Sequence, residues 1–316
     1  MTVDPLLSAL TARARAAAHA RTPTCPCAPT GTLADRPDGT VVRHAGTVAK
    51  AHAPDTDPGD LGRRLITAAR LPGILLPPLT PALSTTRDRL LTLWPYGAPV
   101  DPDDPDAAPW EAAATLLARL HGSGPAAHPG GPLPSMRGPV KAARAIARLR
   151  AAGPHPAAAP VLRAWALLPS WARAEAPQPD RTTLCHGDLH LGQLVRHPAP
   201  DGPWLLIDID DLGTGVAAWD LARPAAWYAC GLLPPDEWTR FLDAYRAAAG
   251  PAVPGDGDPW PALDVPARAL TAQTAALAIV KAIAADRPLD EVEGAVVDAC
   301  RRMASVPPEL AAGSAK

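Results

Sequence analysis

The residues best suited to chemistry gather in one short segment, TLCHGDLHLGQLV, which spans residues 183–195. This segment holds His186, Asp188, His190 and Gln193 between short apolar flanks. A further aspartate, Asp208, ends the next apolar run, WLLID. Side chains of these types can bind a metal ion, move a proton or stabilise a polar turn. Their spacing distinguishes between these chemistries.

The spacing favours phosphoryl transfer. Protein kinases use the pattern H-R-D-L-x-x-x-N, followed by a strand that ends in a metal-binding aspartate. One aspartate accepts the proton of the acceptor hydroxyl, while an amide and a carboxylate hold magnesium against the phosphates. This chain has Asp188, then Gln193 five residues later, then Asp208 at the end of an apolar run. The three groups therefore occur in the required order.

Phosphoryl transfer of this type also needs a cation on the phosphates, and Lys50 is the candidate. The chain contains four lysines and no asparagine, whereas alanine, arginine and proline are abundant. Lys50, in the sequence GTVAKAH, is the only lysine before residue 141 and falls on a predicted strand. A lysine retained in such an arginine-rich chain indicates a site that needs a compact ammonium group. A solvated strand lysine is the alternative.

Two other functions stay open from these residues. His186, Asp188 and His190 could ligate the metal of a hydrolase, although such sites usually recruit a further ligand downstream. His197 is followed by a proline-rich turn instead. The other alternative is a degenerate kinase-like protein that binds a small molecule without turnover. The absence of a glycine-rich loop and of a glutamate partner for Lys50 favours this alternative, and the intact Asp188 and Asp208 argue against it.

The pattern of strands and helices along the chain predicts two lobes, residues 1–97 and 98–316, which position these residues. Residues 30–52 contain short β-prone runs separated by DG and AG turns, which predicts a hairpin or three-stranded meander. Helical spacing follows at residues 60–71, and the runs GILLPPL and RLLTLW predict two further strands. The first lobe is therefore expected to be a small mixed β lobe.

The second lobe is predicted to be mainly helical. It follows a connector rich in Pro and Asp at residues 95–109. Two apolar runs around the PAPDGP turn predict a β-hairpin that leads to Asp208. Pro and Gly stretches separate the remaining patterns. Helical patterns cover residues 109–121, 137–152, 156–173, 217–231, 235–249, 266–286 and 288–304.

Composition limits the classes of partner. The chain has 316 residues, of which 47% are hydrophobic, so it can bury a sizeable core. Its net charge of −2 provides no basic field, and we therefore expect neither nucleic acid nor a membrane as a partner. The first twenty residues favour an amphipathic helix over a secretory signal or a membrane span. We accordingly expect a cytoplasmic protein.

The number and spacing of the cysteines predict no further site. The chain has five cysteines, an odd number, which indicates no disulfide framework. The CPC sequence at residues 25–27 lacks the two-residue gap and the partner ligands of a zinc knuckle. We therefore expect reduced cysteines without a special role.

The motifs HGDLHLGQ and LLIDIDDLGTGVAAWDLA, preceded by LLARLHGSG and followed by FLDAYRAAAG, resemble those of the aminoglycoside phosphotransferase-like family of small-molecule kinases. The resemblance covers residues 30–250 and is specific in the second lobe. It implies an α+β, bilobal protein-kinase-like fold. It also implies ATP or GTP as co-substrate, Mg²⁺ as cofactor and transfer of phosphate to a hydroxyl of a small molecule.

The resemblance assigns roles to the reactive residues. Asp188 would be the catalytic base, and Lys50 would be the lysine that contacts the phosphates. Gln193 and Asp208 would be metal ligands, with Asp210 assisting. Gln193 replaces the usual asparagine, keeping the amide oxygen but adding one methylene group.

Other positions would bind nucleotide or brace the site. The hinge LWPYG would place Leu93 and Trp94 at the nucleotide, although Pro95 has no N–H to offer adenine. His186 would be a structural histidine that supports the catalytic loop, and Asp220 would be a structural carboxylate that braces it.

The acceptor is expected to bind in the helical C-terminal region. His190 would lie near it, and the acidic segment DRPLDEVEGAVVDAC contributes Asp286 and Asp290 as candidates. Asp290 and Asp298 are expected to share one helical face. Carboxylates there would suit a polycationic aminosugar, although an acidic stripe on a terminal helix is more often a solvated face.

The first lobe departs from the family pattern. It has no glycine-rich loop, which leaves the RPDGT turn at residues 36–40 to cover the phosphates. The usual glutamate partner of the lysine is missing, because the first glutamate in the chain is Glu111. The helix after Lys50 offers Asp60 alone, which we expect to act as its N-cap. Lys50 is therefore expected to make no ion pair with that helix and to stay mobile until phosphates arrive.

Overall fold

The computed structural model describes residues 4–19, 25, 27, 31–124, 131–180 and 182–305. The chain forms two compact units. Unit 1 comprises Met1–Ala108, Ala126–Pro134 and Leu191–Asp210, and unit 2 comprises Pro109–Pro125, Ser135–His190 and Asp211–Lys316. This division differs from the expected one at residue 97, because residues 191–210 return to the first unit to complete it.

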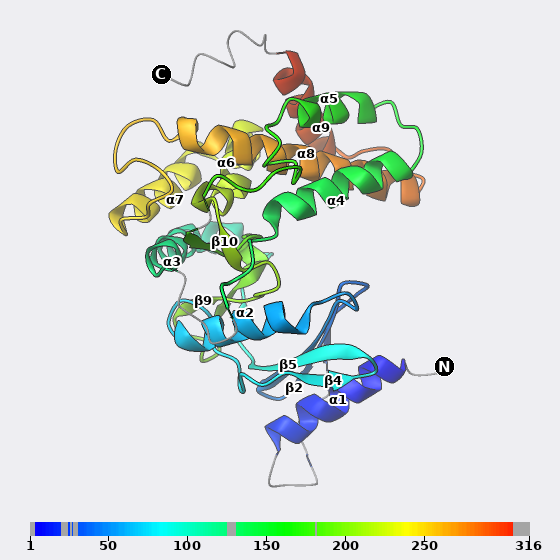
Figure 1. Cartoon of the computed structure of the whole chain (residues 1–316), viewed down its shortest axis with the longest axis vertical. Coiled ribbons are helices and arrows are strands. Elements are labelled where there is room, and N and C mark those ends of the chain that lie inside the picture. Colours follow the sequence, from blue (N-terminus) through cyan, green and yellow to red (C-terminus); the bar gives the residue numbers. More distant parts are fainter. Residues whose placement is uncertain are drawn as a thin grey trace. The chain divides into compact units, whose positions relative to one another are not determined.

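Unit 1 is built on a five-stranded antiparallel sheet with the strand order β1-β2-β3-β5-β4 (Figure 1). The meander expected over residues 30–52 is confirmed, and the RPDGT turn joins its first two strands. The run RLLTLW is also confirmed as a strand. The strands are β1 (Gly31–Arg36), β2 (Gly39–His44), β3 (Thr47–His52), β4 (Ser84–Thr86) and β5 (Arg89–Pro95).

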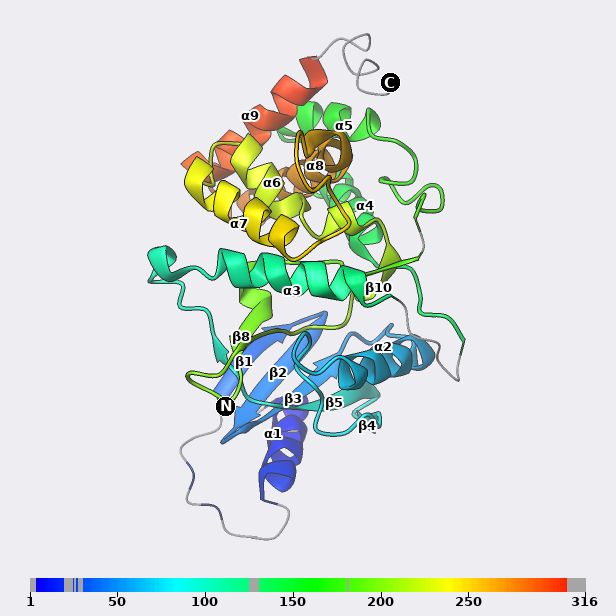
Figure 2. The same cartoon turned by 90° about the vertical axis from the view of Figure 1, so that its left-hand side faces the viewer.

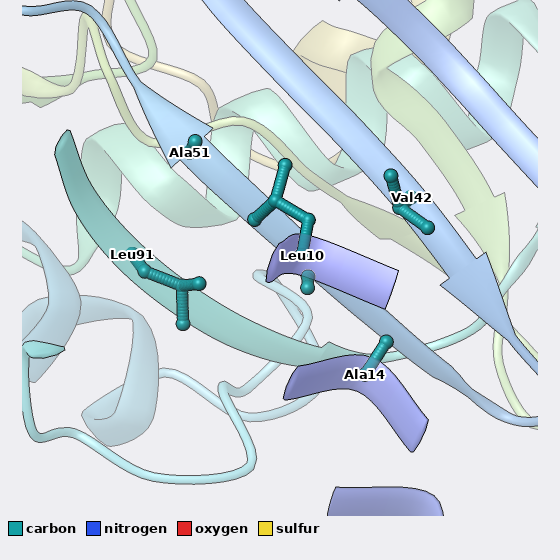
Figure 3. Close-up of a cluster of buried hydrophobic side chains, with 6 residues drawn as sticks. Leu10, Ala14, Val42, Ala51 and Leu91 are labelled. Atoms are coloured by element: carbon teal, nitrogen blue, oxygen red, sulfur yellow. The ribbon is translucent and has the colours of Figure 1, made fainter. Parts of the chain in front are cut away.

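The helix α1 (Pro5–Ala18) covers one face of this sheet (Figure 2). Leu10 and Ala14 of α1 are fully buried against apolar side chains of β2, β3 and β5 (Figure 3). Because side chains alternate along a strand, the residues between those apolar positions face the other way. The buried apolar positions on the α1 side are Val42, Ala49, Ala51 and Leu91. The alternate positions include Val41, Lys50, His52 and Thr92.

The prediction of a strand at GILLPPL is wrong. Pro77 and Pro78 have no N–H to contribute to a ladder, and the run makes only isolated bridges among the described residues. The Leu76 N–H donates to the Leu206 carbonyl at 2.8 Å, and the Leu206 N–H donates to the Ile74 carbonyl at 2.9 Å. These bonds attach the run to residues 204–206 without forming a regular strand.

A second sheet in unit 1 has the order β6-β8-β9. Its strands are β6 (Ala98–Pro99), β8 (Leu194–Arg196) and β9 (Trp204–Leu206), and the 3₁₀ turns η1 (Pro105–Ala107) and η2 (Leu191–Gln193) belong to the same unit. The expected hairpin is confirmed, because β8 and β9 pair in antiparallel register. Leu76 packs with Val195 of β8 and Leu205 of β9 in one buried apolar cluster. The hairpin thus brings Gln193 and Asp208 to the ends of adjacent strands.

Unit 2 is mainly helical, as expected. Its two short strands, β7 (Thr183–Cys185) and β10 (Gly213–Gly215), pair in antiparallel register. The described helices are α3 (Trp110–Gly122), α4 (Gly138–Ala151), α5 (Ala158–Ala166), α6 (Ala222–Ala229), α7 (Pro235–Ala247), α8 (Trp260–Ala284) and α9 (Glu291–Ser305).

Three helix boundaries differ from the prediction by five residues or more. The pattern over 156–173 ends as helix at Ala166, a few residues before Pro169. The pattern over 217–231 begins with a 3₁₀ turn, η3 (Ala217–Trp219), and becomes α-helical only at Ala222. Helix α8 starts six residues earlier than expected, at Trp260, and contains Pro266. The periodic apolar pattern therefore predicted the existence of the helices more accurately than their ends.

Helix α8 is long and apolar enough to cross a membrane by length and composition, and it is the one described helix with that property. However, 61% of its most apolar window is buried inside the structure. Most of its apolar surface is therefore buried against other parts of the structure, as in the core helix of a helical unit.

Candidate functional site

Lys50 lies between two carboxylates of unit 1. Its Nζ is 2.7 Å from Oδ1 of Asp208 and 3.0 Å from Oδ2 of Asp210. Lys50 is in the central strand β3, and the two aspartates follow β9. The lysine side chain is 14% exposed. Lys50 is therefore held in place, contrary to the expectation that it stays mobile until phosphates arrive, because two acids distant in sequence take the place of a helix glutamate.

These contacts set the protonation states. Burial alone would raise the pKa of Asp208, but the Lys50 ammonium outweighs burial and holds that pKa below its ordinary value. The pKa of Asp210 is lowered for the same reason, with a further contribution from His52. Burial would lower the pKa of Lys50, and the two carboxylates raise it instead. The cluster is therefore a lysine cation held by two carboxylate anions at neutral pH.

His52, which no sequence motif singled out, connects this cluster to the sheet. Its Nδ1 is 2.8 Å from Oδ1 of Asp210, and its Nε2 is 2.8 Å from Oγ1 of Thr92. The indole N–H of Trp94 donates to that same hydroxyl at 2.8 Å. Since Thr92 accepts this bond, its own proton is available for Nε2, which leaves the Nδ1 proton for Asp210. His52 thus fixes the orientation of Asp210.

Gln193 completes the cluster and gives it the donor set of a magnesium site. Its Nε2 is 3.4 Å from Oδ2 of Asp208, and its side chain is buried. Asp208 has a left-handed backbone with φ of 65°, a conformation that costs about 1–3 kcal/mol and concentrates at functional sites. Magnesium prefers carboxylate and amide oxygens. Asp208, Asp210 and the Gln193 amide supply such oxygens, so these residues fit the metal.

The two predicted hinge residues lie in β5. Leu93 packs against the apolar cluster beneath α1, and its carbonyl accepts a hydrogen bond from the Leu79 N–H at 2.9 Å. Trp94 is on the alternate face, with its indole N–H engaged by Thr92. The side chain of Leu93 is therefore committed to the core, and a nucleotide contact by either residue stays a prediction.

Helix α2 (Pro58–Arg70) corrects the prediction for Asp60. The N-cap is Asp57, whose Oδ1 accepts the Asp60 N–H at 2.7 Å. Pro58 pre-organises the first turn, so the helix begins two residues earlier than expected. Asp60 instead pairs with Arg63 at 2.5 Å. Asp60 is the only acid in the sequence of α2, and its ion pair in the structure is with Arg63, whereas Lys50 pairs with Asp208 and Asp210.

In unit 2, Asp188 is held by two cations. Its Oδ2 is 2.6 Å from Nζ of Lys141 in α4, and its Oδ1 is 2.9 Å from a guanidinium nitrogen of Arg223 in α6. Lys141 also contacts Asp211 at 2.7 Å. Burial alone would raise the pKa of Asp188, but Lys141 and Arg223 lower it below its ordinary value. Asp188 is therefore ionised at neutral pH, as a proton acceptor must be.

The loop that carries Asp188 is held by Asp220. One carboxylate oxygen of Asp220 accepts the His186 N–H at 2.6 Å, and the other accepts the Gly187 N–H at 2.7 Å. The first oxygen is also 3.0 Å from Nε2 of His121, whose Nδ1 is 2.7 Å from the Tyr245 hydroxyl. Asp220 is fully buried. This network links the loop to α3 and α7.

Two glycines permit close packing around Asp188. Gly187 has φ of 88°, and a Cβ atom there would lie 2.4 Å from the Asp211 carbonyl oxygen. At Gly138, in the first turn of α4, a Cβ atom would lie 2.1 Å from the indole nitrogen of Trp219. Lys141 follows Gly138 by one helical turn, so this contact fixes its position.

The two histidines of the motif differ in environment. His186 is fully buried, and the pKa of His190 is lowered to about 4, mainly by burial. The carboxylate of Asp188 is committed to two cations. Among the described residues, His186, Asp188 and His190 do not form a metal-ligating group. The geometry therefore gives no support to the hydrolase interpretation.

The acidic C-terminal segment is largely engaged locally. Asp290 lies outside α9 and accepts the Glu293 N–H at 2.8 Å, while a Glu293 oxygen accepts the Asp290 N–H at 3.0 Å. This is a capping box, so the prediction that Asp290 and Asp298 share a helical face is wrong. Asp298 pairs with Arg301, and Asp286 has a left-handed φ of 47° after α8. An acceptor role for Asp286 and Asp290 stays a prediction.

Comparison with known proteins identifies the family. A model of the phosphotransferase enzyme family (APH) matches residues 40–264, a range that includes Lys50, Asp188, Gln193 and Asp208. The chain belongs to this family. A search of curated proteins found no significant match.

Solved structures show that the fold is shared with small-molecule kinases. A choline/ethanolamine kinase family protein from Mesorhizobium loti is 16% identical, with a TM-score of 0.55, 95% of this chain covered and 97% of that chain. The aminoglycoside phosphotransferase APH(4)-Ia is 15% identical, with a TM-score of 0.59 and coverage of 95% and 100%. Spectinomycin phosphotransferase APH(9)-Ia, in complex with ADP and spectinomycin, is 12% identical, with a TM-score of 0.53 and coverage of 91% and 93%. The bilobal protein-kinase-like fold predicted from the sequence is thereby confirmed.

Proposed function

We propose that this family member transfers the γ-phosphoryl group of ATP or GTP to a hydroxyl of a small molecule. The observation that carries the proposal is the cluster in unit 1, where Lys50 lies within 3.0 Å of both Asp208 and Asp210. Phosphoryl transfer in kinase-like enzymes relies on a strand lysine at the phosphates and on carboxylate and amide ligands for magnesium. Lys50 is such a strand lysine, and Asp208 and Gln193 supply the carboxylate and the amide.

Each residue has a defined part in this proposal. Asp208 and Gln193, assisted by Asp210, would hold Mg²⁺, which when bound neutralises charge on the phosphates. Lys50 would contact the phosphates, and His52 would keep Asp210 oriented. In unit 2, ionised Asp188 would accept the proton of the acceptor hydroxyl.

The proposed acceptor class is an aminosugar, which deepens the general proposal. Hygromycin B and spectinomycin are bound by two of the structurally similar phosphotransferases. Another similar protein is of the choline/ethanolamine kinase family, so an amino alcohol is the next class to test. The reaction consumes a nucleoside triphosphate, which suits the cytoplasmic location expected from the sequence.

Nucleotide binding and turnover by aspartate variants test the proposal. ATP and GTP with magnesium should raise the thermal midpoint of the wild-type chain, and a coupled assay over aminoglycosides and amino alcohols should detect ADP or GDP release. Asp188→Asn should lower turnover by about 10²–10⁴-fold with nucleotide affinity nearly unchanged. Asp208→Ala should remove the magnesium-dependent part of nucleotide binding.

The matched control is Asp201→Asn, which removes an exposed carboxylate from the turn between β8 and β9. It should change neither measurement. Stabilisation by a small metabolite without any effect of nucleotide would contradict the enzyme and indicate a binding protein. Unchanged turnover in Asp188→Asn would contradict the role of Asp188 as the base.

A further inference from the structure

A second group of potential ligands lies in unit 1, on the α1 side of the main sheet. His19, Cys25, Cys27 and His44 each offer one ligand atom, and the four atoms lie within 4.8 Å of one another. His44 ends β2 two residues after buried Val42, so both side chains lie on the α1 face of the sheet, whereas Lys50 faces the opposite side. This group therefore takes no part in the function proposed above.

The separations within the group suit tetrahedral coordination. Sγ of Cys25 is 2.9 Å from Nε2 of His19 and 3.3 Å from Nε2 of His44. Sγ of Cys27 is 3.3 Å from the same Nε2 of His19. Zinc bonds of about 2.3 Å to sulfur and 2.0 Å to nitrogen place tetrahedral ligand atoms about 3.3–3.8 Å apart. The four atoms therefore need shifts of no more than about 1 Å to surround one ion.

The donor set selects zinc and a structural role. Two thiolates and two imidazoles form a Cys₂His₂ set, which is typical of closed structural zinc sites with no open position for substrate. Two thiolates also neutralise the charge of Zn²⁺. His19 is the C-cap residue of α1, and its backbone N–H donates to the Arg15 carbonyl at 3.0 Å. An ion here would join the end of α1 to the end of β2.

A second described group of potential metal ligands differs from this one, because its ligand atoms are already hydrogen-bonded. His121, Cys185 and Asp220 also lie within 4.8 Å of one another and are fully buried. However, both nitrogens of His121 and both oxygens of Asp220 are already engaged in the hydrogen bonds that hold the catalytic loop. In the first group, both histidines direct Nε2 at cysteine sulfur.

We propose that His19, Cys25, Cys27 and His44 bind one zinc ion that fastens α1 to β2. The spacing H-x₅-C-x-C-x₁₆-H explains why the sequence did not predict the site. A C-x-C pair alone is a weak signal, and its two histidines lie on separate elements that only folding brings together.

Metal analysis of the full chain tests the site directly. The wild-type chain purified without chelators should contain one equivalent of zinc, and the Cys25→Ser/Cys27→Ser double variant should contain none. The matched control is Cys230→Ser/Cys300→Ser, which alters two cysteines of unit 2 and should retain the metal. Substitution with Co²⁺ should give thiolate charge-transfer absorption and the strong visible bands of a tetrahedral ion in the wild type and in the control.

A second measurement works on the wild type alone. Of the five thiols, Cys25 and Cys27 should react with a thiol reagent only after a strong chelator is added. Chelation should lower the thermal midpoint, and zinc but not magnesium should restore it, because a ligand that binds only the folded chain stabilises it. His19→Gln, which keeps both thiols, should weaken zinc affinity and perturb the Co²⁺ spectrum.

Several outcomes would overturn the proposal. One is a metal-free wild type in which Cys25 and Cys27 react with the thiol reagent without chelator and added zinc does not change the thermal midpoint. Another is a Cys25–Cys27 disulfide that chelation does not affect. Co²⁺ bound without thiolate charge transfer would show an adventitious ion only. None of these readouts depends on phosphate transfer, so the zinc site and the proposed function can fail separately.

Discussion

The contact between Lys141 and Asp188 can be measured as a coupling energy. Lys141→Met removes the ammonium but keeps most of the side-chain length, and Asp188→Asn removes the charge but keeps the shape. Each single variant leaves a charge with a second partner, because Arg223 stays on Asp188 and Lys141 stays on Asp211. The fold should therefore survive both changes. A double-mutant cycle then isolates the pair.

The exposure of the two side chains sets the expected magnitude. Lys141 is 31% exposed and Asp188 is 18% exposed. Exposed pairs contribute about 0.2–1 kcal/mol, and breaking a fully buried pair costs about 3–5 kcal/mol. A coupling of about 1–3 kcal/mol at pH 7 is expected for this intermediate case. The folded-state pKa of Asp188 is depressed, so its stabilisation is present above the unfolded pKa of about 3.9 and is lost as the pH falls through the folded pKa.

Urea unfolding followed by tryptophan fluorescence provides the assay. Seven of the nine tryptophans lie in unit 2, so the signal reports on the unit that contains the pair. The control cycle uses Arg148→Met, which removes an exposed cation two turns further along α4, and should show no coupling to Asp188. A Lys141–Asp188 coupling no larger than that of the control at pH 7, in folded variants, would refute the contact. A coupling that persists undiminished at the lowest pH would refute its electrostatic origin.

Three further outcomes are expected. His190→Gln should flatten the dependence of the free energy of unfolding on pH. The pKa of His190 is lowered to about 4 in the folded chain, so the unfolded chain takes up a proton near pH 6.5 that the folded chain does not. This difference costs the wild type at most about 3 kcal/mol between those pH values, less with solvent screening, and equal slopes in urea titrations of both proteins would contradict the prediction. Asp57→Ala should lower the free energy of unfolding by about 1 kcal/mol as a lost N-cap, with a smaller loss for Asp60→Ala, and the reverse order would contradict the assignment of the cap. Gly187→Ala should destabilise the fold by more than about 2 kcal/mol, because the added Cβ atom meets a backbone oxygen. The control Gly153→Ala has φ of 99° and open space around the added Cβ atom, so it measures the backbone strain alone, and equal losses in the two variants would show that the clash is absent.

Local signals in the sequence predicted part of the candidate site. Asp188, Gln193 and Asp208 stand in a short ordered pattern, and the scarcity of lysine drew attention to Lys50. The same scarcity applied to Lys141, the next lysine in the chain, but its helical pattern gave no indication of what the side chain would contact. Its partner comes from a loop 47 residues away.

Long-range contacts account for most of what the sequence could not predict. The missing helix glutamate left Lys50 without an evident partner, because the acids that bind it follow a different hairpin. His52 faces the same side of β3 as Lys50, two residues further on, but only the fold shows that it reaches Asp210. The acidic run near α9 illustrates the converse, since Asp290 and Glu293 satisfy each other as a capping box rather than facing a substrate.

The return of residues 191–210 to unit 1 has a consequence for how the protein is made. Lys50 and Asp208 are 158 residues apart in the chain. At about 5–20 residues per second, a ribosome needs about 8–30 s to synthesise the interval between them. During that time the five strands of the main sheet can already pair, while Lys50 and His52 lack their acidic partners. The nascent first unit therefore presents an uncompensated cation on its sheet for many seconds, and emergence of the β8–β9 hairpin is the event that completes it.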